Sequence, residues 1–226
     1  MIDRTGKARG GSNITDKVNI KSHKIMAMEP EKRDRVINAA MKGFSSGFKN
    51  ASTDVIVRNA GISKGLLFHY FGTKEKLFEF ILWYSFDIMK TEYFGLMNFD
   101  QRDILERIWQ MVLLKMDLSY KYPALFDFIA AAYSAGKDDP ADEFTKYFKT
   151  KQADMLSKMF EDIDTTLFKD GIEPDRAINI IWWSMAGYSD AQVDTDKSIA
   201  DYQKEYARYL SDLKEYFDIL KKVFYK

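Results

Sequence analysis

The sequence predicts an all-helical protein of about nine helices. Apolar residues recur at the three- and four-residue intervals of amphipathic helices in the region that follows residue 30. No stretch alternates apolar and polar residues as a half-buried strand would. Aspartate, proline and glycine stand where such helices commonly begin or end. Together these observations favour an all-α fold.

The N-terminal 28 residues do not share this pattern. They are polar, basic and glycine-bearing, with isolated aliphatic residues. Such a segment buries too little apolar surface to offset the entropy of ordering it, so we expect a flexible basic arm at residues 1–28. The functional alternative for this arm is contact with a DNA minor groove. Met26 or Met28 is an alternative start of the chain. The first helix follows at residues 31–47, with an apolar face of Val36, Ala39, Ala40, Gly43 and Phe44.

Two short helices are expected next, at residues 53–60 and 64–71. Gly61 stands where a helix end commonly needs a left-handed residue, which glycine adopts without a Cβ clash. Ser63 can cap the second helix by accepting a hydrogen bond from its free N–H groups. Leu67 and Phe71, four residues apart, are expected to face inward. On spacing alone, both a helix-turn-helix and an ordinary helical corner remain open.

The residues around this stretch extend the pattern. They are Ile37, Ala39, Ala40, Phe44, Gly47, Ser52, Thr53, Ile56, Ala60 to Gly65, Leu67, Tyr70, Phe71, Lys74, Glu75 and Leu77. Over residues 32–81, about a fifth of the chain, the sequence resembles the DNA-binding domain of TetR-family transcriptional regulators. The resemblance implies a three-helix DNA-binding domain at residues 29–76. A larger helical domain for effector binding and dimerisation would follow at residues 77–226.

Nine residues are the predicted DNA contacts: Thr53, Ser63, Lys64, Gly65, Leu66, Phe68, His69, Tyr70 and Lys74. Lys64 can reach a guanine edge or a phosphate, and Gly65 allows close approach of the backbone. Tyr70 and Lys74 match family positions that contact the phosphate backbone.

Two of these positions depart from the common family pattern. Leu66 stands where a small polar residue is frequent, and Phe68 stands where tyrosine is usual. A phosphate hydrogen bond is therefore not assigned to Phe68, and its alternative role is packing under the first helix. Apolar groups here favour contact with thymine methyl groups.

Six further helices are expected. Five of them span residues 73–97, 100–122, 138–170, 174–190 and 197–224, and one begins after Tyr122 at residue 123. Thr73 and Asp100 are the expected N-caps of the first two. Pro123 and Pro174 open later helices, since proline is tolerated in a first turn. The helix at 73–97 is the covalent link between the two expected domains.

Aromatic residues and methionines are frequent on the helices after residue 77. Such a stripe is more often core than binding pocket. The family resemblance implies a small effector among these helices, and this lining favours an apolar one. The candidate ligand-binding residues are Trp83, Trp109, Phe128, Tyr133, Trp182 and Met185.

The last two helices are also strongly apolar. In the family that the chain resembles, they pair with their copies to form the interface of a homodimer. The candidate interface residues are Ile181, Tyr206, Leu213, Phe217 and Leu220. A twofold dimer would present two recognition helices to two half-sites.

Charge divides the chain unevenly. The 226 residues carry no formal net charge. Residues 1–76 hold 15 Lys and Arg against 7 Asp and Glu, a net charge of +8, and residues 77–226 hold the other 19 against 27, a net charge of −8. Basic charge confined to the region of the expected DNA-binding domain is the electrostatic pattern of phosphate contacts.

Composition argues against several other classes. The chain has no cysteine and only two histidines, His23 and His69, so neither a disulfide nor a thiolate or histidine metal site is expected. It has no glycine-rich phosphate loop, and enzyme activity and cofactors are not expected. The apolar runs are too short to span a bilayer, so we expect a cytoplasmic protein without membrane contact.

The sequence therefore predicts a DNA-binding transcriptional regulator. We expect a repressor that binds a palindromic operator in double-stranded DNA as a dimer and is released by a small hydrophobic effector. The alternative is a helical ligand-binding or protein-interaction module that keeps the fold without functional DNA binding.

Overall fold

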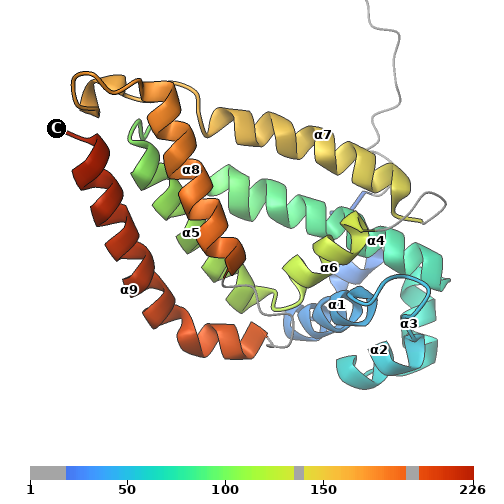
Figure 1. Cartoon of the computed structure of the whole chain (residues 1–226). Helices are drawn as coiled ribbons and strands as arrows, with labels where there is room; N and C mark the ends of the chain where they lie inside the picture. Colours follow the sequence, from blue (N-terminus) through green and yellow to red (C-terminus); the bar gives the residue numbers. More distant parts are fainter. Residues whose placement is uncertain (1–18, 135–139, 192–198) are drawn as a thin grey trace, which may run out of the picture. The chain divides into compact units, whose positions relative to one another are not determined.

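The structure, a computed structural model, describes residues 19–134, 140–191 and 199–226 (Figure 1). These residues form nine α-helices and one isolated β-bridge, which confirms the all-α prediction. The α-helices are α1 Pro30–Phe44, α2 Thr53–Ala60, α3 Lys64–Phe71, α4 Lys74–Ile88, α5 Ile104–Lys121, α6 Leu125–Tyr133, α7 Asp142–Lys158, α8 Pro174–Ala191 and α9 Ile199–Phe224.

The helices belong to two compact units. The first unit contains the described residues up to Asp87 together with Asp127–Thr145, and the second contains Ile88–Phe126 and Lys146–Lys226. The first unit thus holds α1, α2, α3, nearly all of α4 and most of α6. The second holds α5, α8, α9 and most of α7.

A buried apolar core holds α1, α2 and α3 together in the first unit. Phe44 and Ile56 are fully buried, and Leu67 is 1% exposed. α1 and α2 approach so closely at Gly43 that a Cβ there would lie 2.4 Å from Cγ1 of Ile56. Phe44 also packs edge-on against Phe78 of α4, with ring centroids 4.9 Å apart. The first helices of the chain are therefore fixed to the start of α4.

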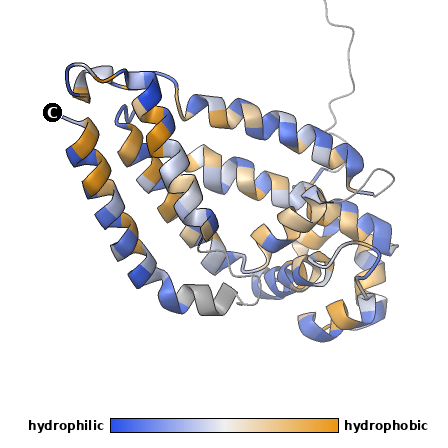
Figure 2. Cartoon of the chain, in the orientation of Figure 1, coloured by the Kyte–Doolittle hydropathy of each residue, from blue (hydrophilic) through white to orange (hydrophobic). Residues whose placement is uncertain are grey.

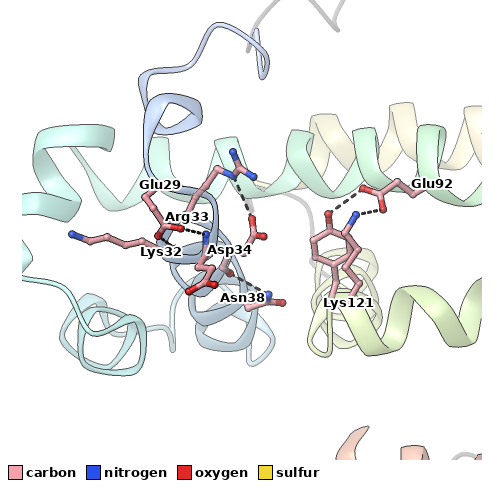
Figure 3. A network of polar contacts seen from close by, with 9 residues as sticks. Glu29, Lys32, Arg33, Asp34, Asn38, Glu92 and Lys121 are labelled. Carbon is pink, nitrogen blue, oxygen red and sulfur yellow. Dashed lines mark hydrogen bonds and ion pairs between the residues drawn. The ribbon is translucent and has the colours of Figure 1, made fainter.

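The segment in front of α1 is packed on this unit. Lys24–Ala27 form a 3₁₀ turn, in which Ile25 is fully buried, and Met28 is buried as well. Glu29 then caps α1, accepting hydrogen bonds from the backbone N–H groups of Glu31 and Lys32 (Figure 3), and these bonds lower its pKa. The expectation of a flexible arm is therefore wrong for residues 24–28, because their few aliphatic side chains suffice to anchor them. Residues 1–18 lie outside the described residues.

α4 ends earlier than expected. The α-helix stops at Ile88, and the chain continues as a π-helical turn at Met89–Tyr93 and a 3₁₀ turn at Phe94–Leu96. Glu92 of the π turn accepts hydrogen bonds from Lys121 Nζ (2.6 Å) and the Tyr122 hydroxyl (3.0 Å) at the C-terminal end of α5 (Figure 3). These bonds tie the irregular turn to α5.

The core of the second unit joins α5, α8 and α9 (Figure 1). Ile108 of α5, Ile181 of α8 and Leu213 of α9 are each at most 1% exposed. Trp109 packs against Phe217 with ring centroids 5.6 Å apart. At the end of the chain the Tyr225 hydroxyl donates to Asp103 Oδ1 at 2.7 Å. Burial and this carboxylate raise the pKa of Tyr225.

Asp103, rather than Asp100, caps α5. Its carboxylate accepts hydrogen bonds from the N–H groups of Leu105 and Glu106. Both aspartates match the capping preference, and the sequence does not reveal that the chain makes a turn at Phe99 and Asp100 before it enters α5.

α7 is the helix whose end differs most from expectation. It stops at Lys158, not near residue 170, and a 3₁₀ turn at Thr165–Leu167 follows, capped by Asp164. Asp162 adopts a left-handed φ of 54°, so the helix does not continue through it. The guanidinium of Arg107, itself 1% exposed, donates to carbonyls in and after the last turn of α7 and before α5. Its acceptors are the carbonyl oxygens of Phe99, Gln101, Lys158, Met159 and Glu161.

Candidate nucleic-acid interface

The turn between α2 and α3 has the geometry that the sequence predicts. Gly61 is left-handed, with φ 65° and ψ 37°. The N–H of Gly61 donates to the carbonyl of Arg58, and the N–H of Ile62 donates to that of Val57. This pair of bonds defines a Schellman motif, which ends α2 and turns the chain. The Ser63 hydroxyl then accepts from the N–H of Leu66 at 3.1 Å, so the predicted cap of α3 is confirmed.

α3 has a buried face and an exposed face. Leu67 and Phe71 point into the unit, as expected. Ser63, Lys64, Gly65 and His69 are exposed, and Leu66, Phe68 and Tyr70 are half-buried. Seven of the nine predicted DNA contacts therefore lie on one short helix and its cap, and none of the seven is buried.

Lys64 is held by a partner that sequence reasoning missed. Its ammonium lies 2.9 Å from Oδ1 of Asp54, which stands in the first turn of α2. Both side chains are more than half exposed, so the pair adds little stability. Its effect is to orient Lys64 toward α2. The ten-residue separation hides the pair in the sequence, because only the turn at Gly61 brings the two residues together.

The two remaining predicted contacts lie at helix starts. Thr53 is the first residue of α2 and is half-buried, while Ser52 is the N-cap residue. Lys74 begins α4, and its ammonium lies 4.5 Å from the centroid of the Phe48 ring. The Thr73 hydroxyl accepts from the N–H of Lys76 at 3.2 Å, which confirms Thr73 as the cap of α4.

Residues 36–81 match the family model described as bacterial regulatory proteins, tetR family. Residues 36–81 thus match the DNA-binding domain of the TetR family. This match covers α2, α3 and their turn completely, and it extends from α1 into α4. The chain is thus a DNA-binding transcriptional regulator, the class that the sequence predicted.

Solved TetR-family structures share the fold over most of the chain. The TetR family protein CprB from S. coelicolor A3(2) is 20% identical, with a TM-score of 0.53, over 87% of this chain and 90% of that one. A TetR-like regulator from Rhodococcus sp. RHA1 is 18% identical, with a TM-score of 0.50, over 81% of this chain and 97% of that one. At these identities the likeness shows the fold.

The six candidate ligand-binding residues divide between the two units. Trp83, Phe128 and Tyr133 belong to the first unit, and Trp109, Trp182 and Met185 belong to the second. Several make aromatic contacts, such as Trp83 with Phe144 and Trp182 with Phe160, with centroids 5.5 and 5.4 Å apart. Trp109 and Trp182 remain half-buried at the edge of the second unit's core.

Four of the five candidate dimer residues are buried within the single chain. Ile181, Leu213, Phe217 and Leu220 belong to the core of the second unit, and their contact with a partner stays a prediction. Tyr206 is half-buried beside Tyr120 of α5, with ring centroids 5.3 Å apart. The sequence cannot reveal which side of a broadly apolar helix faces its own chain.

A different apolar surface is exposed on α8 and α9, which we call the α8–α9 face. Each of its large side chains is at least 44% exposed, and Trp183 is 66% exposed. Its residues are Ile180, Trp183, Tyr216, Ile219 and Val223. Tyr188 links the two helices, lying 4.8 Å from Tyr216 between ring centroids. Figure 2 shows the hydrophobic stretches of α8 and of the C-terminal part of α9.

Two kinds of feature are absent from the ranges that the structure describes. There, no group of three or more histidine, aspartate or glutamate residues is placed to hold a metal ion. Within the same ranges, no helix has the length and hydropathy needed to cross a bilayer.

Proposed function

We propose that the protein is a repressor that binds a palindromic operator as a homodimer and is released by a small hydrophobic effector. The observation that carries the DNA-binding part is the outer face of α3. Its capped N-terminus presents Ser63, Lys64 and Gly65 to solvent next to the basic start of α4. A surface of this size fits the major groove, where base edges are distinguishable.

The division of labour on this surface follows from chemistry. Lys64 and Leu66 are the proposed base-reading residues, and Tyr70 and Lys74 are the proposed phosphate contacts. Phosphate contacts set register and supply most of the affinity, while base contacts supply sequence preference. Lys64 would exchange its exposed ion pair with Asp54 for DNA, which costs little because such a pair is weak.

Substitution of Gly65 separates DNA binding from stability. A Cβ at Gly65 would meet nothing within 4 Å, so Gly65→Ala should keep the fold and raise its stability by less than about 1 kcal/mol, the value for a helix interior, because Gly65 is the second residue of α3. The same methyl group would crowd a closely approaching duplex, and we expect binding to weaken by about 1–3 kcal/mol. The measurement is selection of duplexes from random sequence, followed by titration of the selected duplex and thermal denaturation. Wild-type protein should select an inverted repeat. Equal affinity of both proteins for it would contradict close approach at Gly65.

The dimer part of the proposal rests on the α8–α9 face. Several adjacent, large apolar side chains exposed on a surface are typical of an interaction site. A second copy of the same face is the proposed partner, because a twofold pairing is self-complementary and gives two recognition helices. The half-sites would then lie roughly 34–36 Å apart or a multiple of that distance.

The effector part of the proposal concerns the second unit. Trp109 and Trp182 lie half-buried at the edge of its core, where an apolar molecule would cover them. We expect such a molecule to change tryptophan fluorescence and to weaken operator binding by a coupling of about 1–3 kcal/mol. Linkage requires that operator DNA weaken the effector by the same factor. A molecule that binds the second unit but leaves operator affinity unchanged is not the effector. If every apolar compound that binds the second unit leaves operator affinity unchanged, release by a hydrophobic effector is refuted.

A further inference from the structure

The segment in front of α1 contacts the C-terminal end of the recognition helix α3. Lys24 donates a hydrogen bond from its ammonium to the backbone carbonyl of His69. The same ammonium lies 5.8 Å from the centroid of the Tyr70 ring. Both partners lie in the last turn of α3, and both were predicted DNA contacts.

The carbonyl of His69 loses its helical donor because of how α3 ends. In a continuing helix the N–H of residue 73 would bond this carbonyl. Here Gly72 turns the chain with a φ of 77°, and the N–H of Thr73 bonds Phe71 instead. The Lys24 ammonium takes the place of that donor. A cation also suits this end of a helix, where the backbone dipole is negative.

His23 and Ile25 hold Lys24 in this position. The His23 ring lies 5.2 Å from the Phe71 ring and 4.5 Å from the Phe80 ring between centroids, so it spans the end of α3 and the side of α4. Burial and, to a smaller extent, the neighbouring Lys24 lower the pKa of His23, which favours the neutral imidazole. Ile25 is fully buried and anchors the 3₁₀ turn.

We propose that Lys24 is a positioning residue for sequence recognition: it fixes the last turn of α3 at His69 and thereby the direction in which the His69 side chain meets the bases. This inference rests on the proposed DNA binding by α3 and adds a residue outside the matched segment 36–81. A positioning role differs from a phosphate contact in what it changes. Loss of positioning lowers affinity for the preferred site, whereas loss of a phosphate contact lowers affinity for all duplexes and reduces the salt slope by about one.

The test compares Lys24→Met, Lys24→Arg and Lys21→Met in the full chain. Lys21 is exposed, and its substitution removes the same charge three residues earlier. For the duplex that wild-type protein selects from random sequence, Lys24→Met should bind about three- to tenfold more weakly. Its affinity for a scrambled duplex and its salt slope should stay as in wild type. Lys24→Arg retains a donor and the charge, so it should keep most of the preference for the selected duplex over the scrambled one. Lys21→Met should leave the ratio of the affinities for these two duplexes unchanged.

A second readout needs no DNA. Amide hydrogen exchange at the C-terminal end of α3 should quicken in Lys24→Met and not in Lys21→Met, because only the first loses the bond to His69. Unchanged amide exchange in Lys24→Met would overturn the inference about Lys24, even if wild-type protein binds no duplex. Failure of this inference can therefore be told apart from failure of the proposed function. An equal loss for both duplexes with a slope reduced by about one would overturn it as well, in favour of a direct phosphate contact.

Discussion

Ile219→Lys is expected to convert the protein from a dimer into a folded monomer and to remove measurable operator binding. Ile219 lies at the middle of the exposed apolar residues of α9, and it is 56% exposed in the single chain. In a twofold dimer the substitution places a lysine on both sides of the interface, and an unpaired buried charge costs at least about 3 kcal/mol. The dissociation constant of the dimer should rise at least about a thousandfold. Light scattering measures the mass, and titration with the selected duplex measures the binding.

Two further variants make this result specific. Asp218→Lys puts a lysine on the adjacent polar side of the same helical turn, and it should leave the dimer intact. Leu213→Lys should unfold the second unit rather than release a folded monomer, because Leu213 is 1% exposed within its own chain. A dimeric Ile219→Lys protein would place the interface elsewhere.

Arg107→Met is expected to lower the free energy of unfolding by about 3–5 kcal/mol, because several buried carbonyls lose a charged donor. The methionine fills part of the arginine's volume but leaves five backbone carbonyls without their shared donor. Unpaired buried carbonyls cost about 1–3 kcal/mol each when water does not replace the donor. Chemical denaturation followed by tryptophan fluorescence is the measurement, since Trp109 and Trp182 lie in the same unit.

Arg102→Met is the matched control. Arg102 also donates to a backbone carbonyl, that of Asp162 at 3.0 Å, but it is exposed. Water can replace the donor there, so we expect a loss below about 1 kcal/mol. Equal losses of unfolding free energy in Arg107→Met and Arg102→Met would contradict the assignment of Arg107 as the buried link between α5 and the end of α7.

Local chemistry explains why so much of the DNA-binding unit was predictable. Gly61 and Ser63 determine the turn between α2 and α3 through their own backbone and side-chain bonds, and both act within five residues of the sequence. Thr73 and Pro174 mark helix starts in the same local way. Where a signal is local, the sequence displays it directly.

The features that sequence reasoning missed depend on distant partners. The end of α7 depends on Arg107, which is 51 residues away from the first carbonyl of α7 that it binds. The position of Lys24 depends on His69, 45 residues away. The choice of interface residues on α9 depends on which side of an apolar helix its own chain covers. In each case the residue type was visible, and its partner was created by the fold.

The central claim is that the first unit binds DNA through α3 and the start of α4. The salt dependence of DNA binding tests this claim most directly. The logarithm of the association constant for the selected duplex should fall linearly with the logarithm of the salt concentration, with a slope of several units. Lys74→Ala should weaken binding to all duplexes alike and reduce that slope by about one. A constant affinity across salt concentrations, or no binding to any duplex at low salt, would contradict the claim.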